Sequence, residues 1–286
     1  MAEPRIILHE TGKTAEASGA IERELPLLER LWSSPLLRKS LLLLAMAAIW
    51  ETYARYLDNP LLFPTLSETL GAMAENIRSG TLPARAWTSL RILLTGYAAG
   101  LTLATIMTVL AISSRIGTDL LETLTAMFNP LPAIALLPLA LIWFGLGSGS
   151  LVFVLVHSVL WAVALNTHAG FLGVSQTLRM VGRNYGLRGL PYVFRILVPA
   201  AFPSILTGLK IGWAFAWRTL IAAELVFGVS SGQGGLGWFI FENRNTLDIP
   251  AVFAGLLTVI LIGLVVENLV FRVIERRTVR RWGVQA

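Results

Sequence analysis

The sequence has no cysteine and few charged side chains for its length. None of the 286 residues is cysteine, which excludes disulfide frameworks, thiol nucleophiles and cysteine-ligated metal sites. Charged residues make up 14% of the chain, against about 25% in an average soluble domain. The hydrophobic share is 55% and the mean hydropathy is +0.68. This balance indicates an integral membrane protein.

Histidine is scarce too, and the chain has no nucleotide-binding motif. Three histidines, His9, His157 and His168, do not cluster with carboxylates at ligand spacing, so we expect no metal site and no catalytic centre. No GxxxxGK[ST] pattern occurs that could cradle the phosphates of ATP. The net charge of +6 could suggest nucleic-acid binding, but the basic residues lie between apolar runs, as in membrane proteins. We expect no bound cofactor and no nucleic acid.

Six segments are apolar enough to cross a bilayer core about 30 Å thick. They are residues 38–57, 88–112, 120–145, 150–168, 203–228 and 250–272. The first is interrupted by Glu51 and Arg55. The third contains Asn129, Pro130 and Pro132, which predict a kinked helix packed against protein. The predicted fold class is all-α and polytopic, with about six transmembrane helices.

The distribution of lysine and arginine predicts the orientation. Residues 1–36 are polar and lack the apolar core of a signal peptide, so we expect a cytosolic tail. With this end inside and six crossings, sixteen basic residues face the cytosol, and the outer loops hold Arg78, Arg85 and Arg244. This asymmetry favours cytosolic N- and C-termini.

Small residues at helical spacing predict close helix packing. Gly96 and Gly100 form a GxxxG pattern in the second segment, and Gly208 and Gly212 form another in the fifth. Such spacing lets two helix backbones approach each other. Packing within the chain is the favoured interpretation, since these patterns are common in membrane helices.

Residues 169–202 form a basic loop that is too polar to span the membrane. Leu178, Val181 and Tyr185 recur at i, i+3 and i+7, which predicts a short amphipathic helix, and Gly186 predicts its end. A second short element begins at Leu187. The loop could merely set topology. Two short helices around a fixed glycine favour a docking surface instead.

A resemblance to a known family rests on the spacing in this loop. Gly186 is followed by nine residues and then Ile196-Leu197-Val198-Pro199. This is similar to the signature of type I ABC importer permeases, E-A-A, three residues, G, nine residues, I-x-L-P. The E-A-A positions fall here on Met180, Val181 and Gly182.

Further motifs resemble the permease branch for aliphatic sulfonates, taurine and nitrate, and the likeness covers about residues 40–282. They are Asn129–Pro132, Ile142–Gly147, Pro203–Lys210, Trp217–Glu224 and Gly234–Gly237.

The resemblance implies a type I ABC transporter transmembrane domain in the cell inner membrane. The permease domain is expected at 37–286, with its core at about 84–273 and the loop 169–202 as the coupling element. Implied partners are two copies of an ABC ATPase that binds ATP and Mg, a second permease copy, and a periplasmic or lipid-anchored solute-binding protein. The chain itself would catalyse no reaction. Residues expected to contact the ATPase are Arg179, Gly182, Arg183, Tyr185, Gly186 and Leu187.

The fifth segment carries charges that predict a substrate path. Lys210, Trp217 and Glu224 lie seven apart and share one face, and Arg218 is displaced by about 100°. With Asn129 near the prolines, Trp217, Arg218 and Glu224 are the expected lining for a small, anionic, sulfonate-, taurine- or nitrate-like solute. Alternatively, Arg218 and Glu224 pair inside the bundle and Lys210 extends to the cytosol.

A stand-alone secondary transporter or channel is the second candidate. Such a protein is expected to contain inverted repeats with broken helices at matching positions. The sequence contains no convincing internal repeat, which favours the permease interpretation.

Overall fold

The computed structural model describes residues 34–227 and 234–278, and all regular elements within these ranges are helices. The chain divides into two compact units, Met1–Ile49 and Trp50–Ala286. Helix α2 (Pro35–Leu57) begins in the first unit, and its leucines Leu42, Leu43 and Leu44 are exposed. The predicted tail, residues 1–36, lies almost entirely outside the described residues.

Four helical segments have the length and composition of a membrane span. Two are the single helices α4 (Thr81–Ser113) and α7 (Ser148–Leu172). The third is Val193–Val226, made of a π-helical turn, η2 (Val193–Leu197), and most of α10 (Val198–Phe227). The fourth is Ile249–Arg277, made of α12 (Ile249–Val265), the π-helical η3 (Val266–Phe271) and α13 (Arg272–Arg277). These segments confirm the predicted all-α, multi-pass class.

The other two predicted spans differ from expectation. Segment 38–57 is helical, as α2, but it is not among the four, since Glu51 and Arg55 lower its hydropathy. Segment 120–145 is a pair of helices, α5 (Arg115–Phe128) and the continuous η1–α6 (Ala133–Leu136 and Leu137–Phe144), bent by 87°. The described residues therefore contain four helical segments long and apolar enough to span a membrane, or five if the bent pair is one, against about six expected.

The bend between α5 and η1 has a covalent cause. It falls at Asn129–Pro132, between the last helical bond of α5, donated by the Asn129 N–H to the Thr125 carbonyl (2.9 Å), and the start of η1. Pro130 and Pro132 have no N–H to donate, so the helical ladder cannot run through them. The predicted kink is thus a complete break between two helices.

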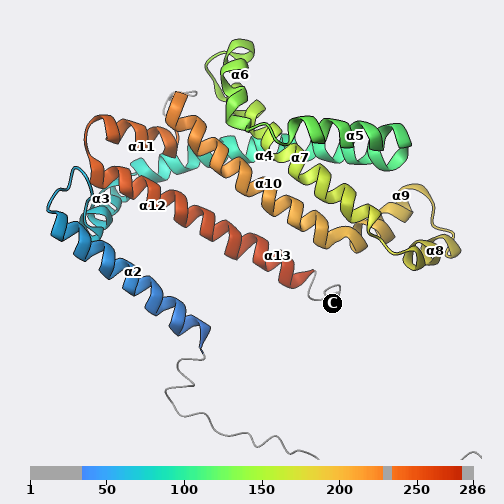
Figure 1. The fold of residues 1–286 in the computed structure, drawn as a ribbon, viewed down its shortest axis with the longest axis horizontal. Helices are drawn as coiled ribbons and strands as arrows, with labels where there is room; N and C mark the ends of the chain where they lie inside the picture. Colours follow the sequence, from blue (N-terminus) through green and yellow to red (C-terminus); the bar gives the residue numbers. More distant parts are fainter. Residues whose placement is uncertain (1–33, 228–233, 279–286) are drawn as a thin grey trace, which may run out of the picture. The chain divides into compact units, whose positions relative to one another are not determined.

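Helix α7 is the centre of the second unit. It packs against both α4 and α10, and Figure 1 shows α7 and α10 side by side. The α7 side chains Leu155, Val159 and Val163 are almost completely buried. An all-round apolar helix of this kind is expected inside a bundle.

Both predicted glycine seams pack against α7. A Cβ atom added at Gly96 would lie 2.6 Å from the Leu155 Cβ, and one at Gly100 would lie 2.7 Å from the Val159 Cβ. On α10, a Cβ at Gly208 would lie 2.9 Å from the Asn166 Cβ. These contacts confirm packing within the chain as the role of both patterns.

A buried carboxyl group joins α10 to α11 (Leu236–Asn245) and α4. Glu224 is 2% exposed, and its oxygens accept hydrogen bonds from the Ser89 hydroxyl (2.8 and 2.9 Å) and the Gly237 N–H (2.9 Å). The Leu236 N–H donates to the Ser89 hydroxyl (2.8 Å). The acidic side chain therefore satisfies a free N–H at the start of α11, where it also meets the positive end of the helix dipole. We call these residues the Glu224 network.

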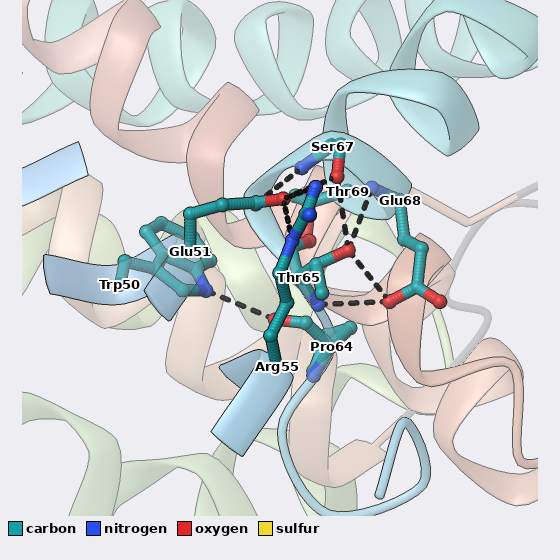
Figure 2. Close-up of polar contacts among 8 residues, drawn as sticks. All are labelled: Trp50, Glu51, Arg55, Pro64, Thr65, Ser67, Glu68 and Thr69. Atoms are coloured by element: carbon teal, nitrogen blue, oxygen red, sulfur yellow. Dashed lines mark hydrogen bonds and ion pairs between the residues drawn. The ribbon is translucent and has the colours of Figure 1, made fainter. Parts of the chain in front are cut away.

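A second polar cluster fixes the corner between α2 and α3 (Leu66–Arg78), as Figure 2 shows. Glu51 on α2 accepts bonds from the Ser67 hydroxyl (2.8 Å) and the Ser67 N–H (3.1 Å) and pairs with Arg55. Thr65 and Glu68 form a reciprocal capping box at the start of α3. Glu51 and Arg55, the charges that make α2 less apolar than a membrane span, thus take part in the polar contacts of this corner.

The basic loop contains α8 (Gln176–Asn184) and α9 (Gly189–Tyr192). The two predicted short helices on either side of Gly186 are therefore confirmed. The π-helical turn η2, which joins α9 to α10, is an additional element that was not among those predicted.

Replacing Gly100 by alanine should destabilise the protein. The added methyl group meets the Cβ of Val159, which cannot rotate away, and overpacking of this kind costs about 1–3 kcal/mol. Gly71→Ala, in α3 with open space around the site, is the matched control and should leave stability equal or slightly higher. Thermal unfolding in detergent compares the two. Equal midpoints for both variants would contradict tight α4–α7 packing.

Removing the Glu224 side chain should loosen α11. Glu224→Ala leaves the Ser89 hydroxyl and the Gly237 N–H without acceptors, which costs on the order of 2–4 kcal/mol. Hydrogen exchange at the Gly237 amide should accelerate. The control is Glu242→Ala on the same helix, since Glu242 is 49% exposed, pairs with Arg85 at 3.0 Å and should matter by less than about 1 kcal/mol. Unchanged exchange at Gly237 in Glu224→Ala would refute the role of the network.

Candidate functional site

A cavity of about 350 Å³ lies where the α5–η1 break meets α7 and α10. The break contributes residues 129–134, α7 contributes His157, Ser158 and Trp161, and α10 contributes Phe215, Arg218, Thr219 and Ala222. We call it the α7–α10 cavity. Its wall at the break is irregular backbone, which membrane proteins tolerate where it is buried in protein or faces a water-filled space.

Arg218 is the charged residue of this cavity. Its Nε donates to the Ala214 carbonyl (3.0 Å), and its guanidinium carbon lies 5.2 Å from the centre of the Phe215 ring. Within residues 34–227 and 234–278, no carboxylate pairs with it, so the alternative of an Arg218–Glu224 pair does not describe this structure. The remaining guanidinium donors are available to a ligand.

Two ring nitrogens on α7 add to the polar lining. His157 Nε2 and Trp161 Nε1 are buried and have no hydrogen-bond partner among the described residues. A hydrogen bond joins the His157 ring to the backbone of Phe128, so only Nε2 of that ring is without a partner in the described part of the chain. The Trp161 ring stacks on Phe128 with centroids 5.7 Å apart. Buried polar atoms without partners are rare in native proteins and need an explanation. A polar solute bound in the cavity is the partner that would explain them.

The chemistry of the cavity favours an anion. The described lining contains a guanidinium, an indole N–H and the amide of Asn129, each of which can donate hydrogen bonds, and no carboxylate. The Ser158 hydroxyl donates to the Val154 carbonyl (3.1 Å) and lies 3.1 Å from the Thr219 hydroxyl oxygen. Phe215 and Trp161 contribute aromatic surface to the lining.

The structure separates the four predicted path residues. Asn129 and Arg218 line the α7–α10 cavity. Trp217 is 7% exposed in the main hydrophobic core, and Glu224 belongs to its own buried network, so neither lines the cavity. The face predicted from Lys210, Trp217 and Glu224 is the packed side of α10. Lys210 forms an ion pair with Glu275 on α13 at 2.6 Å, rather than extending freely.

Sequence reasoning missed His157 and Trp161 as members of this site. A signal was present: the two residues are four apart on an otherwise apolar span, which places them on the same side of one helix. Their neighbour Phe128 belongs to another helix, so this grouping required the fold.

The basic loop is held in shape by its glycine. The Leu187 N–H donates to the Gly182 carbonyl (3.1 Å) and the Gly186 N–H donates to the Arg183 carbonyl (2.9 Å). These two bonds form a Schellman motif, which requires a left-handed residue after the helix. Gly186 has φ = +71°, a conformation that side-chain-bearing residues avoid.

The outer face of α8 is unusually apolar for a polar loop. Met180, Val181 and Tyr185 are 55%, 41% and 81% exposed, and Arg183 lies among them. The periodic apolar residues therefore face outward instead of packing on the protein. Exposed apolar groups mixed with arginine are typical of protein-binding surfaces.

Two of the predicted docking residues have internal roles. Arg179 donates from Nη2 to the Phe171 carbonyl (2.5 Å) and from Nε to the Val174 carbonyl (3.1 Å), which ties α8 to the end of α7. Gly182 is buried, and a Cβ there would lie 2.9 Å from Tyr192 and Ile196. Both residues shape the loop, while Arg183 and Tyr185 are exposed on it and Leu187 is partly exposed.

Comparisons with known proteins agree with this geometry. The family model described as "binding-protein-dependent transport system inner membrane component" matches residues 96–280. A putative ABC transporter permease protein of Methanocaldococcus jannaschii is 30% identical over 224 residues, which is 77% of this chain and 83% of the relative.

Two further relatives have substrates in their names. The taurine transport system permease protein of Escherichia coli is 29% identical over 257 residues, 86% of this chain and 91% of the relative. The nitrate import permease protein of Synechocystis is 31% identical over 175 residues, 61% of this chain and 62% of the relative. From the family match and the similarity over about three quarters of the chain, the chain belongs to the binding-protein-dependent inner-membrane components, the non-catalytic, multi-pass permeases of ABC transporters.

Proposed function

We propose that this permease moves a small anionic solute, with a sulfonate, taurine-like or nitrate-like charge, from the periplasm to the cytosol. The observation that supports the proposal most strongly is Arg218, which lines the α7–α10 cavity without a carboxylate partner among the described residues and shares that cavity with the unpartnered indole N–H of Trp161. The names of the taurine and nitrate relatives point the same way, because both solutes carry an anionic group of oxygens.

Transport in this scheme is powered by a separate ATPase. Two ATPase subunits bind ATP and Mg, two permease copies form the pathway, and a solute-binding protein delivers the substrate from outside. The sequence has no phosphate-binding loop of its own, which supports this division of labour. Both termini face the cytosol, on the argument from basic residues.

The exposed face of α8 is the proposed contact with the ATPase. Met180, Val181 and Tyr185 offer apolar area, and Arg183 offers a planar group that can bond carboxylates or carbonyls in two places. ATP can drive the cycle if it binds more tightly to one conformation of the assembly, because a ligand shifts populations by its differential affinity. Gly186 keeps the loop rigid enough to transmit that difference.

Reconstitution in liposomes tests the function as a whole. The permease, its ATPase and its binding protein should together take up a radiolabelled taurine or nitrate only when ATP is enclosed with the ATPase. Omitting the ATPase should abolish uptake. Uptake by the isolated chain would instead support a stand-alone transporter or channel and overturn the proposal.

Arg218→Gln should reduce uptake at least about tenfold, because a lost hydrogen bond to a charged group costs about 1.5–3 kcal/mol. The matched control is Arg244→Gln on α11, whose guanidinium also lies over an aromatic ring, Phe241 at 5.5 Å, but outside the cavity. Co-purification with the ATPase should be equal in both variants. Normal uptake by an assembled Arg218→Gln variant would show that the residue does not contact the solute.

Gly186→Val should leave the chain in the membrane but detach or uncouple the ATPase. A β-branched residue at φ = +71° strains the end of α8 by about 1–2 kcal/mol, and relief of that strain displaces the docking face. Gly80→Val is the control, since Gly80 also has a positive φ, +77°, but lies at the α3–α4 turn. ATPase retention on the purified permease and substrate-stimulated hydrolysis are measured. Full coupling in Gly186→Val would contradict the docking assignment.

A further inference from the structure

A second cavity, of about 550 Å³, lies at the junction of the α4–α5 turn with the basic loop. It is lined by the end of α4, the start of α5, the end of α7 and parts of α8, α9 and η2. We call it the basic cavity. It shares no lining residue with the α7–α10 cavity.

The charge on the described lining of the basic cavity is positive. Arg115 and Arg179 contribute guanidinium groups, and no aspartate or glutamate lines it. Arg179 already donates to two carbonyls, whereas Arg115 is exposed and has no carboxylate partner in the described part of the chain. Arg115 is also the first residue of α5, where the helix dipole favours an anion.

Two further polar side chains of this cavity have no partner in residues 34–227 and 234–278. His168 is 4% exposed and makes no hydrogen bond there, although it lines the cavity. The Tyr192 hydroxyl is buried and likewise unpaired. A buried polar group needs an acceptor or donor to offset its lost hydration. These side chains provide the polar contacts that a phosphate group would use.

An apolar groove adjoins the basic cavity. Its volume is about 260 Å³, and it shares the residues Ile112, Phe171 and Val193 with the cavity. The groove runs along α4 between Leu101 and Ile112, against α7 and the η2–α10 segment. That stretch of α4 rises about 16 Å. One leaflet of the hydrocarbon core is about 15 Å thick.

We propose that the basic cavity and the apolar groove together bind one anionic phospholipid. The phosphate headgroup lies against Arg115, His168 and Tyr192, and an acyl chain fills the groove along α4. The continuity of a positively charged cavity with an apolar groove of one-leaflet length favours a lipid over free phosphate. Basic pockets between helices at the membrane surface are a known way to bind such headgroups.

The bound lipid has a structural consequence. Arg179 and Tyr192 belong to the basic loop, and Arg115 belongs to the α4–α5 turn, so the headgroup ties these two segments together. This lipid site requires that the chain lies in a membrane. It does not depend on which solute is transported or on which ATPase binds.

Native mass spectrometry of the full-length permease in detergent tests the headgroup. Phosphatidylglycerol should bind with one high-affinity copy per chain, at least about tenfold more tightly than phosphatidylcholine with the same acyl chains. Arg115→Gln and the isosteric Tyr192→Phe should each weaken phosphatidylglycerol binding several-fold. Arg188→Gln is the control, since Arg188 is an exposed arginine of the same loop outside the described lining. Equal affinity for the two lipids, or unchanged binding in Arg115→Gln, would overturn the proposal.

A groove variant separates the lipid from free phosphate. Thr105 is exposed in the groove, and Thr105→Trp should fill it without touching the headgroup site. Phosphatidylglycerol binding should fall, and thermal unfolding without lipid checks that the variant folds. Inorganic phosphate at millimolar concentration should not displace the lipid from the unaltered protein. Displacement by phosphate, or full lipid binding by Thr105→Trp, would show that the site takes a free anion or that the groove is not used.

Discussion

The fold depends on how closely α4 and α10 approach α7. At Gly96, Gly100 and Gly208 there is no room for a methyl group, because the side chains of α7 lie directly against the backbones of α4 and α10. Inside a lipid phase, apolar burial drives helix association weakly, and van der Waals packing of this kind takes its place. Both cavities are bordered by this packed core. The α7–α10 cavity opens at the break between α5 and η1, and the basic cavity lies where α7 ends.

Much of the fold could be predicted from the sequence, because hydrophobic length and glycine spacing are local properties. Spans near 88–112, 150–168, 203–228 and 250–272 are present, and the seams pack as expected. The prolines at 130 and 132 signalled a disturbance, but not its size, since the 87° angle depends on what α5 and α6 pack against. Segment 38–57 was predicted to span the membrane, but its Glu51 instead accepts a hydrogen bond from Ser67 at the corner between α2 and α3. Ser67 is sixteen residues away in sequence.

The functional residues were harder to predict because their roles depend on neighbours from other helices. Arg218 stood out as an intramembrane charge and does line a cavity. Glu224 stood out for the same reason, yet it caps α11, a role set by Ser89 and Gly237. Gly186 was predicted correctly as a helix stop, because a Schellman motif is specified by adjacent residues. Arg179 belonged to the predicted docking set, but its bonds to the end of α7 appear only in three dimensions.

The proposed anionic cargo of the α7–α10 cavity also bears on energy supply. Arg218 has no carboxylate partner in the described part of the chain, which suits a negatively charged solute, and a cell interior is electrically negative. Each elementary charge moved inward against that field costs about 2.3 kcal/mol per 100 mV. An anion therefore runs uphill electrically even when its concentrations are equal on both sides. A cargo with the proposed net negative charge thus requires an external source of work, which is what a permease coupled to nucleotide hydrolysis provides.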